Sequence, residues 1–327
     1  VTGTNGKSTT SKLISDLLSI DSIENFLGGN IGIPLLDFYN ESKEIIFHVI
    51  ELSSFQLEST VSFNPYISIL LNIYPDHLDR YKSFKDYSFQ KEKILNLNKQ
   101  GNNIVCINDK KTLEIYDKYK NKVIPISNKV IKKGIYFEDN KIIDNFFGSE
   151  IKIYLKDISP SLFGSFNMDN ILSAYVVSKI LGIKIDKFLL TVKNFKGLPH
   201  RLENIYKNNF FQVINNSKAT NLDACIKSIL NFNNINLIMG GKAKEKKFMK
   251  ILKYKSRINK IYLIGESAEF IFNQLKNEVN CEIFECLELA IDTMFLDIKN
   301  LKKYQTILFS PACTSFDQFN NFEERGN

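Results

Sequence analysis

The chain has 327 residues, of which 44% are apolar and 24% are charged, and its net charge is +7. This length suffices for two domains of ordinary size with a globular composition. No apolar run approaches the ~20 residues that span a bilayer, so we expect no membrane association. Lysine supplies nearly all of the positive charge without clustering, and arginine occurs only at positions 80, 201, 257 and 325, which disfavours nucleic acid. The five cysteines show no C-x-x-C spacing, which predicts reduced thiols and a cytoplasmic protein.

The opening residues, Val1-Thr-Gly-Thr-Asn-Gly-Lys-Ser-Thr9, precede an amphipathic pattern that predicts a helix over residues 9–18. In a phosphate loop, glycines let backbone N–H groups face phosphate oxygens, and the helix N-terminus adds a favourable field. Lys7 can then neutralise the outer phosphates, and the Ser8 hydroxyl can ligate Mg²⁺. A solvated glycine-rich turn is the alternative, since Val1 departs from the generic pattern. A buried strand normally precedes such a loop, so we expect a fragment whose sheet has a gap or an exposed edge.

Apolar runs alternating with helical patterns predict a parallel sheet covered by helices on both sides, with strands over residues 45–50, 66–71 and 103–107. Glu51 ends the first strand, at the edge where such sheets bind ligands; a solvated strand-end glutamate is the alternative. Asp76-His77-Leu-Asp-Arg80 follows the second strand, and a neutral imidazole at His77 is a candidate metal ligand. His48 lies within a strand, which predicts a core or packing role. Residues 134–156 predict antiparallel hairpins beside this sheet.

A domain boundary is predicted near Gly197-Leu-Pro199, after a helical pattern over residues 169–181. It divides the chain into residues 1–198 and 199–327, with His200 at the junction. The second part again alternates strands with helices, which predicts a smaller Rossmann-like unit. Its strands are expected at 211–215, 235–239, 260–264 and 304–309, and its helices at 222–230, 246–252, 268–275 and 287–296.

Several motifs along the whole chain resemble those of the Mur ligases. They occupy residues 3–9, 28–34, 51–58, 76–81, 164–170, 197–203, 216–221 and 310–326. Ser217-Lys-Ala-Thr-Asn221 and the Ser-Pro-Ala-Cys stretch followed by Asp-Gln-Phe are typical of the D-glutamate-adding type. The resemblance implies a central phosphate-loop ATPase domain and a smaller Rossmann-like C-terminal domain, with the N-terminal uridine-binding domain missing.

The resemblance also implies ATP as a cofactor, two Mg²⁺ sites, and UDP-N-acetylmuramoyl-L-alanine and D-glutamate as substrates. It places the protein in peptidoglycan synthesis, and so in cell-wall biogenesis, cell shape, cell cycle and division, as a cytoplasmic monomer. Carboxylate phosphorylation would give an acyl phosphate, which the D-glutamate amine attacks. Domain closure is then expected to bring the substrates together. Another Mur ligase, a folylpolyglutamate synthase-like enzyme, a phosphate-loop ATPase that makes no bond, and a binding module for acidic partners are the alternatives.

Site residues follow from matching motif positions. The metal set is Ser8, Glu51, His77 and Lys91, and the catalytic set is Lys7, Glu51, His77 and Lys91. The ATP set is Gly3, Thr4, Asn5, Gly6, Lys7, Ser8, Thr9, Asn167, Asn170, His200, Arg201 and Asn216. Asn30, Ser53 and His77 match contacts to the muramoyl-alanine end, whereas Lys218, Thr220, Lys244, Ser315 and Phe322 match the D-glutamate pocket.

Lys91 owes its place to the resemblance alone. On its residues, the charged helix predicted over 86–93 would simply expose it to solvent. It fits the family spacing Tyr-x-x-x-Lys-x-x-Ile, in which the lysine is carbamylated and becomes an anionic ligand. Two departures from the family pattern bear on the other ligands: Asn216 replaces an aspartate, and Ala243 and Glu245 replace an aspartate and a glycine around Lys244.

Overall fold

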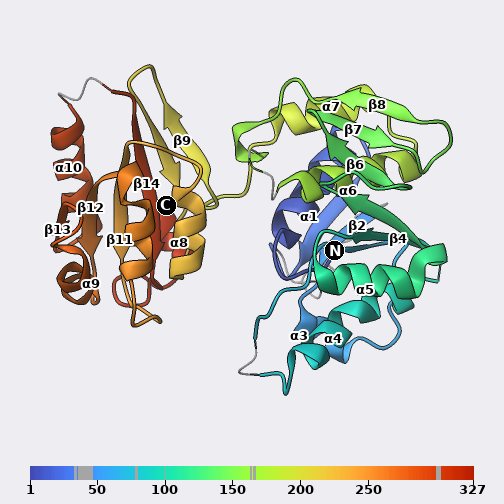
Figure 1. Ribbon diagram of the computed structural model, residues 1–327, viewed down its shortest axis with the longest axis horizontal. Coiled ribbons are helices and arrows are strands. Elements are labelled where there is room, and N and C mark those ends of the chain that lie inside the picture. The colour runs from blue at the N-terminus through green and yellow to red at the C-terminus, as the bar shows by residue number, and fades with distance from the viewer. Residues whose placement is uncertain are drawn as a thin grey trace. The chain divides into compact units, whose positions relative to one another are not determined.

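The computed structural model describes the chain except for residues 33–34, 36–46, 78–79, 100, 163, 165–166 and 300–302 and the side chain of residue 160. Parts of the predicted strand 45–50 and of the motifs at 28–34, 76–81 and 164–170 therefore lie outside the described residues. The chain divides into two compact units, Val1–Phe195 and Lys196–Asn327 (Figure 1). The sequence places its boundary after residue 198, close to this division.

Parallel strands form most of the sheet in the first unit. The six-stranded sheet has the order β3-β4-β5-β6-β7-β8. Strands β3 to β6 run parallel to one another, β7 runs antiparallel to β6, and β8 runs antiparallel to β7. Its strands are β3 (Ile67–Leu70), β4 (Asn102–Cys106), β5 (Val123–Ser127), β6 (Ile135–Glu138), β7 (Lys141–Asp144) and β8 (Ile151–Tyr154). The hairpins expected over residues 134–156 thus extend the sheet itself. A separate parallel pair consists of β1 (Asn25–Gly29) and β2 (Phe47–Glu51).

Val1 and Thr2 join the two sheets at the end that leads into the predicted phosphate loop. The Leu52 amide donates to the Val1 carbonyl over 2.9 Å, and the Thr2 amide donates to the Ile69 carbonyl over 2.8 Å. The expected gap between β2 and β3 is therefore bridged at these two residues. Among the described residues, no other hydrogen-bonded strand lies between β2 and β3. The loop that follows thus leaves the sheet at the carboxyl ends of its parallel strands.

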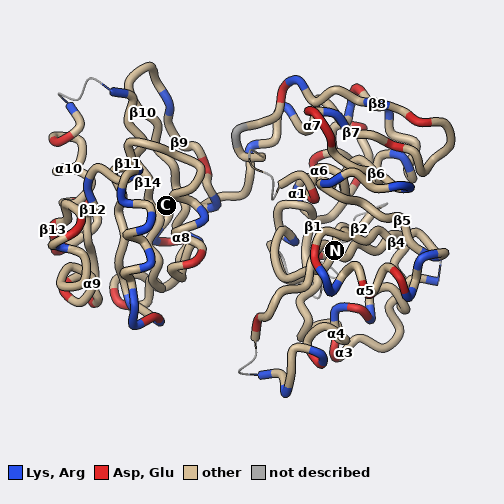
Figure 2. The backbone as a smooth tube through the Cα atoms, viewed as in Figure 1, with Lys and Arg blue, Asp and Glu red and all other residues tan. Residues whose placement is uncertain are grey.

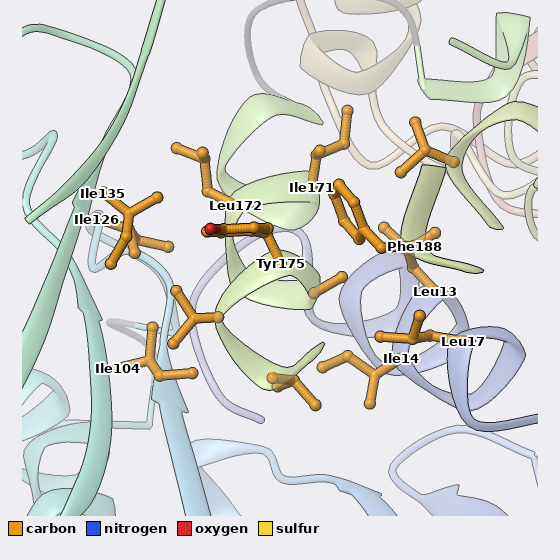
Figure 3. Packing of buried hydrophobic residues seen from close by; sticks show 14 of the residues in the cluster. Leu13, Ile14, Leu17, Ile104, Ile126, Ile135, Ile171, Leu172, Tyr175 and Phe188 are labelled. Atoms are coloured by element: carbon orange, nitrogen blue, oxygen red, sulfur yellow. The ribbon is translucent and has the colours of Figure 1, made fainter. Parts of the chain in front are cut away.

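Helices cover both faces of this sheet. One hydrophobic cluster joins the sheet to α1 (Lys7–Ile20), α6 (Met168–Leu181) and α7 (Ile185–Asn194), and another joins it to α3 (Ser54–Ser59), α4 (Phe84–Leu97) and α5 (Lys110–Tyr119). Figure 3 shows Tyr175 of α6 between Ile126 of the sheet and Leu13 of α1. This packing fixes the start of α1, and with it the phosphate loop, against the sheet.

The second unit is a six-stranded sheet of order β13-β12-β11-β14-β10-β9, parallel except for β9. Its strands are β9 (Glu203–Lys207), β10 (Phe211–Asn215), β11 (Ile235–Gly240), β12 (Ile258–Ile264), β13 (Cys281–Ile283) and β14 (Gln305–Ala312). One face packs on α8 (Leu222–Ile229), the 3₁₀ helix η4 (Met249–Arg257) and α9 (Ala268–Leu275), and the other on α10 (Leu287–Ile298). The short α11 (Phe322–Gly326) ends the unit. The two predicted α/β units are thus both present.

Two sequence expectations are only partly met. The helix predicted over residues 246–252 is present as the 3₁₀ helix η4, which begins only at Met249. Lys244, Lys246 and Lys247 would have crowded positive charge at the positive end of an α-helix. Of the two roles expected for His48, core or packing, the structure bears out the packing role: its side chain is exposed, and its ring packs edge-on against Phe26.

Charge is distributed over both units. Figure 2 shows Lys and Arg interspersed with Asp and Glu along the elements of each. Within the described part of the chain, no helix combines the length and the hydropathy needed to cross a membrane. The segment over residues 242–250, at the start of η4, departs from this even distribution by holding five lysines.

Candidate functional site

The loop before α1 has the backbone geometry of an anion site. Gly6 adopts the left-handed conformation (φ 82°), and a Cβ there would lie 2.6 Å from Asn170 Oδ1. The Asn72 carbonyl accepts from the Thr4 amide, and its side chain accepts from the Asn5 amide over 2.8 Å. No side chain caps the N-terminus of α1, so its first N–H groups can face phosphate oxygens.

Two lysine ammonium groups meet at this loop. Lys7 Nζ donates to the carbonyls of Gly3 and Thr4, each over 3.0 Å. Lys91 Nζ, from α4, also donates to the Gly3 carbonyl, over 2.8 Å. The loop therefore holds two cations at one backbone oxygen, where an anionic ligand would relieve their repulsion.

Lys91 is only 2% exposed, which contradicts the solvated lysine expected from its charged helix. Burial, followed by the repulsion of Lys7, lowers the pKa of Lys91 to about 7. Its ammonium also lies 5.0 Å from the centre of the Tyr87 ring. A substantial fraction of this amine is therefore uncharged at neutral pH, and an uncharged amine can act as a nucleophile.

Glu51 ends β2 with its carboxylate buried. Asn30 Nδ2 donates to Glu51 Oε1 over 2.8 Å, whereas Oε2 has no hydrogen-bond partner among the described residues. A buried carboxylate oxygen without a partner is costly unless a cation satisfies it. Ser8, at the start of α1, is also buried. Together, the Glu51 carboxylate and the Ser8 hydroxyl provide oxygen donors that suit Mg²⁺.

His77 stands at the edge of this region. It has a positive φ of 53°, and its Nε2 lies 3.6 Å from Asp76 Oδ2. Its ring meets the Phe55 ring edge-on. Across the described residues, no group of three or more His, Cys, Asp or Glu side chains forms a metal site. A second metal here would therefore need a ligand of another type, which an unmodified Lys91 cannot supply.

The remaining predicted residues of the first unit hold the local structure. Asn170 Oδ1 accepts from Thr10 Oγ1, and Asn170 Nδ2 donates to Asn167 Oδ1, each over 2.8 Å. The Ser53 hydroxyl caps α3 by accepting from the Gln56 amide. Thr9 is half-buried on α1. Both asparagines are buried, so they fix the start of α6 beside the phosphate loop.

His200, Arg201 and Asn216 all belong to the second unit. His200 is buried with a φ of 62°, and its Nδ1 lies 3.1 Å from Asn215 Nδ2. The Arg201 amide donates to the Leu198 carbonyl. Asn216 Nδ2 donates to Ser310 Oγ over 3.2 Å. The amide at position 216 is thus part of the buried hydrogen bonding of this unit.

Loops at the carboxyl ends of β10, β11 and β14 carry the residues matched to an amino-acid pocket. Lys218 and Lys244 are exposed, and Thr220 is half-buried. Ser315 is buried. Lys218 Nζ lies 4.1 Å from the centre of the Phe322 ring. The structure thus brings Lys218 and Phe322 together, and these loops display several exposed lysines, Lys218 and Lys244 among them.

Several residues that shape these regions were missed from the sequence. Arg325 and Glu245 lie at the pocket loops of the second unit, and Tyr87 and Asn72 hold the phosphate loop. The Tyr87 hydroxyl lies 2.9 Å from Thr4 Oγ1, and Glu245 Oε1 accepts from the Leu222 amide over 3.2 Å. Asn72, whose side chain accepts from the Asn5 amide, and the other three residues all act through contacts between segments distant in the sequence, which no local pattern reveals.

Comparison with known proteins identifies relatives of both units. A family model described as the Mur ligase middle domain matches residues 1–178. The whole chain is 40% identical to UDP-N-acetylmuramoylalanine–D-glutamate ligase of Rickettsia bellii and covers 73% of it. It is 34% identical to the ligase of the same name from Geotalea uraniireducens and covers 72% of that protein.

Solved structures share the fold. MurF of Acinetobacter baumannii has a TM-score of 0.71 and 17% identity, over 94% of this chain and 72% of that one. MurF of Thermotoga maritima, in complex with ADP, has a TM-score of 0.67 and 18% identity, over 94% and 74%. The fold, together with the loop that precedes α1, is that of a phosphate-loop α/β protein. With relatives matched along its whole length, the chain belongs to the Mur ligase family.

Proposed function

We propose that this protein is an ATP-dependent ligase that adds D-glutamate to UDP-N-acetylmuramoyl-L-alanine during peptidoglycan precursor synthesis. The observation that carries the proposal is the 40% identity to a D-glutamate ligase, which extends over the whole chain and therefore over both units. The phosphate loop, with its two lysines and its buried acid, provides the chemistry that such a reaction needs. We further propose that the protein acts in the cytoplasm as a monomer.

The reaction has two steps. A carboxylate oxygen of the muramoyl-alanine substrate attacks the γ-phosphorus of ATP, and the bond between that phosphorus and the bridging oxygen breaks to release ADP. The nitrogen of the D-glutamate amine then attacks the carbonyl carbon of the acyl phosphate. The carbon–oxygen bond to phosphate breaks, phosphate leaves, and the nitrogen loses a proton to complete the amide. Positioning and charge stabilisation supply most of the catalysis in phosphoryl transfer.

The phosphate loop binds and orients the nucleotide in this proposal. The backbone N–H groups of residues 3–9 face the phosphates, and Lys7 exchanges its carbonyl partners for phosphate oxygens. Because Lys7 already lies 3.0 Å from two loop carbonyls, a short reorientation suffices. Asn167 and Asn170, at the start of α6, and also His200, Arg201 and Asn216 are the other proposed nucleotide ligands. Asn216 offers no negative charge there.

Two Mg²⁺ would be held by Ser8 and Glu51 and by His77 and Lys91, and bound metal would offset the phosphate charge. The unpartnered Oε2 of Glu51 supports the first site. The second requires that the Lys91 nitrogen attack CO₂, forming an N–C bond and losing one proton, to give an anionic carbamate. A pKa of about 7 supports this step, because the amine must be uncharged to react. Among the described residues, Glu51 and Asp76 are the acids whose charge acts on Lys91.

Asn30, Ser53 and His77 would contact the muramoyl-alanine end of the substrate. Asn30 also holds Glu51 through its side-chain amide, and an amide of this kind has a further N–H and a carbonyl oxygen with which to bind such a ligand. Lys218, Thr220, Lys244, Ser315 and Phe322 would bind D-glutamate. Two exposed lysines suit a dicarboxylate, since each carboxylate gains a charge-assisted hydrogen bond.

Phosphate release by the full-length protein tests this function. With ATP, release should require both UDP-N-acetylmuramoyl-L-alanine and D-glutamate, and omission of either should abolish it. L-glutamate, diaminopimelate and D-alanyl-D-alanine serve as matched controls for the amine. Equal turnover with any of them would disprove the substrate assignment, and steady hydrolysis without an amine would indicate an ATPase that makes no bond.

A further inference from the structure

Arg325 is a buried cation whose hydrogen-bond partners among the described residues are all uncharged. It lies on α11 and is 3% exposed. Its Nε donates to Ser217 Oγ over 3.1 Å, and its Nη2 donates to the Ser217 carbonyl over 2.9 Å. Its Nη1 donates to the Cys313 carbonyl over 3.1 Å. Burying a guanidinium without a hydrogen-bonded carboxylate is costly, so these contacts call for a functional explanation.

The residues that Arg325 contacts belong to the segments that carry the proposed D-glutamate pocket. Ser217 immediately precedes Lys218, and Cys313 lies in the segment that leads to Ser315. The Ser217 hydroxyl also donates to the carbonyl of Phe322 over 2.8 Å. Arg325 is therefore bonded to the loop that displays Lys218, to the loop that holds Ser315, and, through Ser217, to Phe322 on its own helix.

The fourth segment, which leads from β11 to Lys244, touches the same guanidinium. Gly241 has a φ of 122°, and a Cβ built there would lie 3.2 Å from Arg325 Nη1 and 2.3 Å from the Thr314 carbonyl. The backbone of this turn therefore packs directly on the arginine. The amide of Lys242 donates to the Thr314 carbonyl over 2.9 Å, which ties the turn to the loop that follows β14.

We propose that Arg325 is a positioning residue that sets the geometry of the amino-acid pocket by binding the backbones of the segments that carry it. This inference rests on the proposed function and adds to it a residue that does not touch the substrate. The planar guanidinium presents its donors in a fixed fork, so one side chain can hold the Ser217 and Cys313 backbones at a set spacing. A lysine ammonium is a single point and cannot reproduce that fork. Burial lowers the pKa of Arg325 to about 10, so it stays charged at neutral pH and adds to the attraction of the pocket for a dicarboxylate.

Arg325→Lys tests the role of the fork while keeping the charge. Because displacement of binding groups by about 1 Å can cost about 10²-fold, we expect the KM for D-glutamate to rise about 10-fold or more. The KM values for ATP and for the nucleotide-sugar substrate should stay within about two-fold. Arg257→Lys is the matched control, since Arg257 also donates to a backbone carbonyl of this unit, that of Phe232, but lies on η4. An unchanged KM for D-glutamate in a folded Arg325→Lys variant would overturn the proposal.

Two further measurements keep the test decisive. If Arg325→Lys fails to fold, as judged by its thermal unfolding, Ser217→Ala removes one acceptor and the link to Phe322 while leaving the guanidinium in place. It should raise the KM for D-glutamate by a smaller factor, and no rise would contradict the inference. Direct titration of D-glutamate by calorimetry should show the same weakening without turnover. Failure of the wild-type protein to use D-glutamate would refute the proposed function itself, whereas wild-type activity with unaffected variants would refute only the role of Arg325.

Discussion

In the first unit Lys91 and Glu51 are buried, Lys7 is half-buried, and both lysines donate to the Gly3 carbonyl of the phosphate loop. In the second unit Lys218 and Lys244 are exposed on loops, and the charged side chain that is buried among the described residues is Arg325. The two units share the same parallel architecture and place their polar residues at the carboxyl ends of strands. They differ in which charged side chains are buried away from water.

This difference has a physical basis. Charges buried near one another interact strongly because water screens them little, so the first unit can shift the pKa of Lys91 and leave Glu51 Oε2 available for a cation. Exposed lysines interact weakly with their surroundings, so the second unit must fix its ligand groups through the backbone. A buried network of hydrogen bonds provides that rigidity. Mutations should therefore change rate and pH dependence in the first unit, and substrate affinity in the second.

The largest effect is expected from Lys7→Met. Lys7 is the cation that the loop holds over its own carbonyls, and loss of a charge at a transferring phosphoryl group costs about 10³-fold in kcat. Phosphate release under saturating substrates measures this loss. Lys12→Met on the same helix, where Lys12 pairs with Asp16, is the control and should retain kcat. Comparable losses of kcat in both variants would indicate that the substitutions act by destabilising α1.

Lys91→Met should lower kcat by about 10²-fold and also change how stability depends on pH. The pKa of Lys91 is about 7 in the folded chain and 10.5 for an ordinary lysine, so between these values the unfolded chain holds more protons than the folded one. The free energy of unfolding of the wild type should therefore increase as the pH rises through this window. At pH 7 and below, this added stability should be absent. Denaturation in CO₂-free buffer at several pH values, with the exposed Lys85→Met as control, measures the difference. Parallel curves for wild type and Lys91→Met would show that Lys91 does not titrate in this way.

The carbamate itself can be observed directly. In ¹³C-labelled bicarbonate, the wild type should give a carbamate carbon signal that is absent from Lys91→Met. The same signal should persist in Lys85→Met, because that lysine is exposed on the same helix. A wild-type spectrum without the signal would remove Lys91 from the proposed second metal site.

In the second unit, Lys218→Met should raise the KM for D-glutamate about 10-fold, since a hydrogen bond to a charged group contributes about 1.5–3 kcal/mol. The kcat at saturating D-glutamate should fall much less, in contrast to Lys7→Met. Lys227→Met, which removes an exposed lysine from α8, provides the control. If Lys218→Met lowered kcat without changing KM, the proposed division between rate and affinity would fail.

An effect on stability, in place of rate or affinity, is expected from Asn30→Ala. It removes the donor to Glu51 Oε1 and leaves both oxygens of a buried carboxylate without a side-chain partner among the described residues. We expect the free energy of unfolding to fall by about 1–3 kcal/mol, as measured by urea denaturation. Asn121→Ala, at an exposed position, should change it little. Added Mg²⁺ should reduce the difference for Asn30→Ala if the metal binds Glu51, and an unchanged difference would argue against that site.

Local patterns in the sequence determined much of the fold. Glycines and a lysine before an amphipathic stretch predict the phosphate loop and α1, because both depend on neighbouring residues. The same holds for β10 (Phe211–Asn215) and α9 (Ala268–Leu275), whose bounds match those expected. By contrast, β1, β9 and β13 escaped prediction, since each is short and is held by its neighbour in the sheet. The helix expected over residues 246–252 is present as the 3₁₀ helix η4, where lysines crowd its start.

Tertiary structure alone decided which charged side chains are buried and what they contact. Among the many lysines of the chain, only packing of α4 against the phosphate loop buries Lys91 and brings it to the Gly3 carbonyl, 88 positions away. Arg325 likewise acquires its role from Ser217, 108 positions away. Burial and the approach of distant backbone groups set the pKa and the partners of a side chain, and neither is encoded by its immediate neighbours. The sequence by itself therefore determined the loop and the strand–helix order, whereas the folded chain determined the environment in which each charge acts.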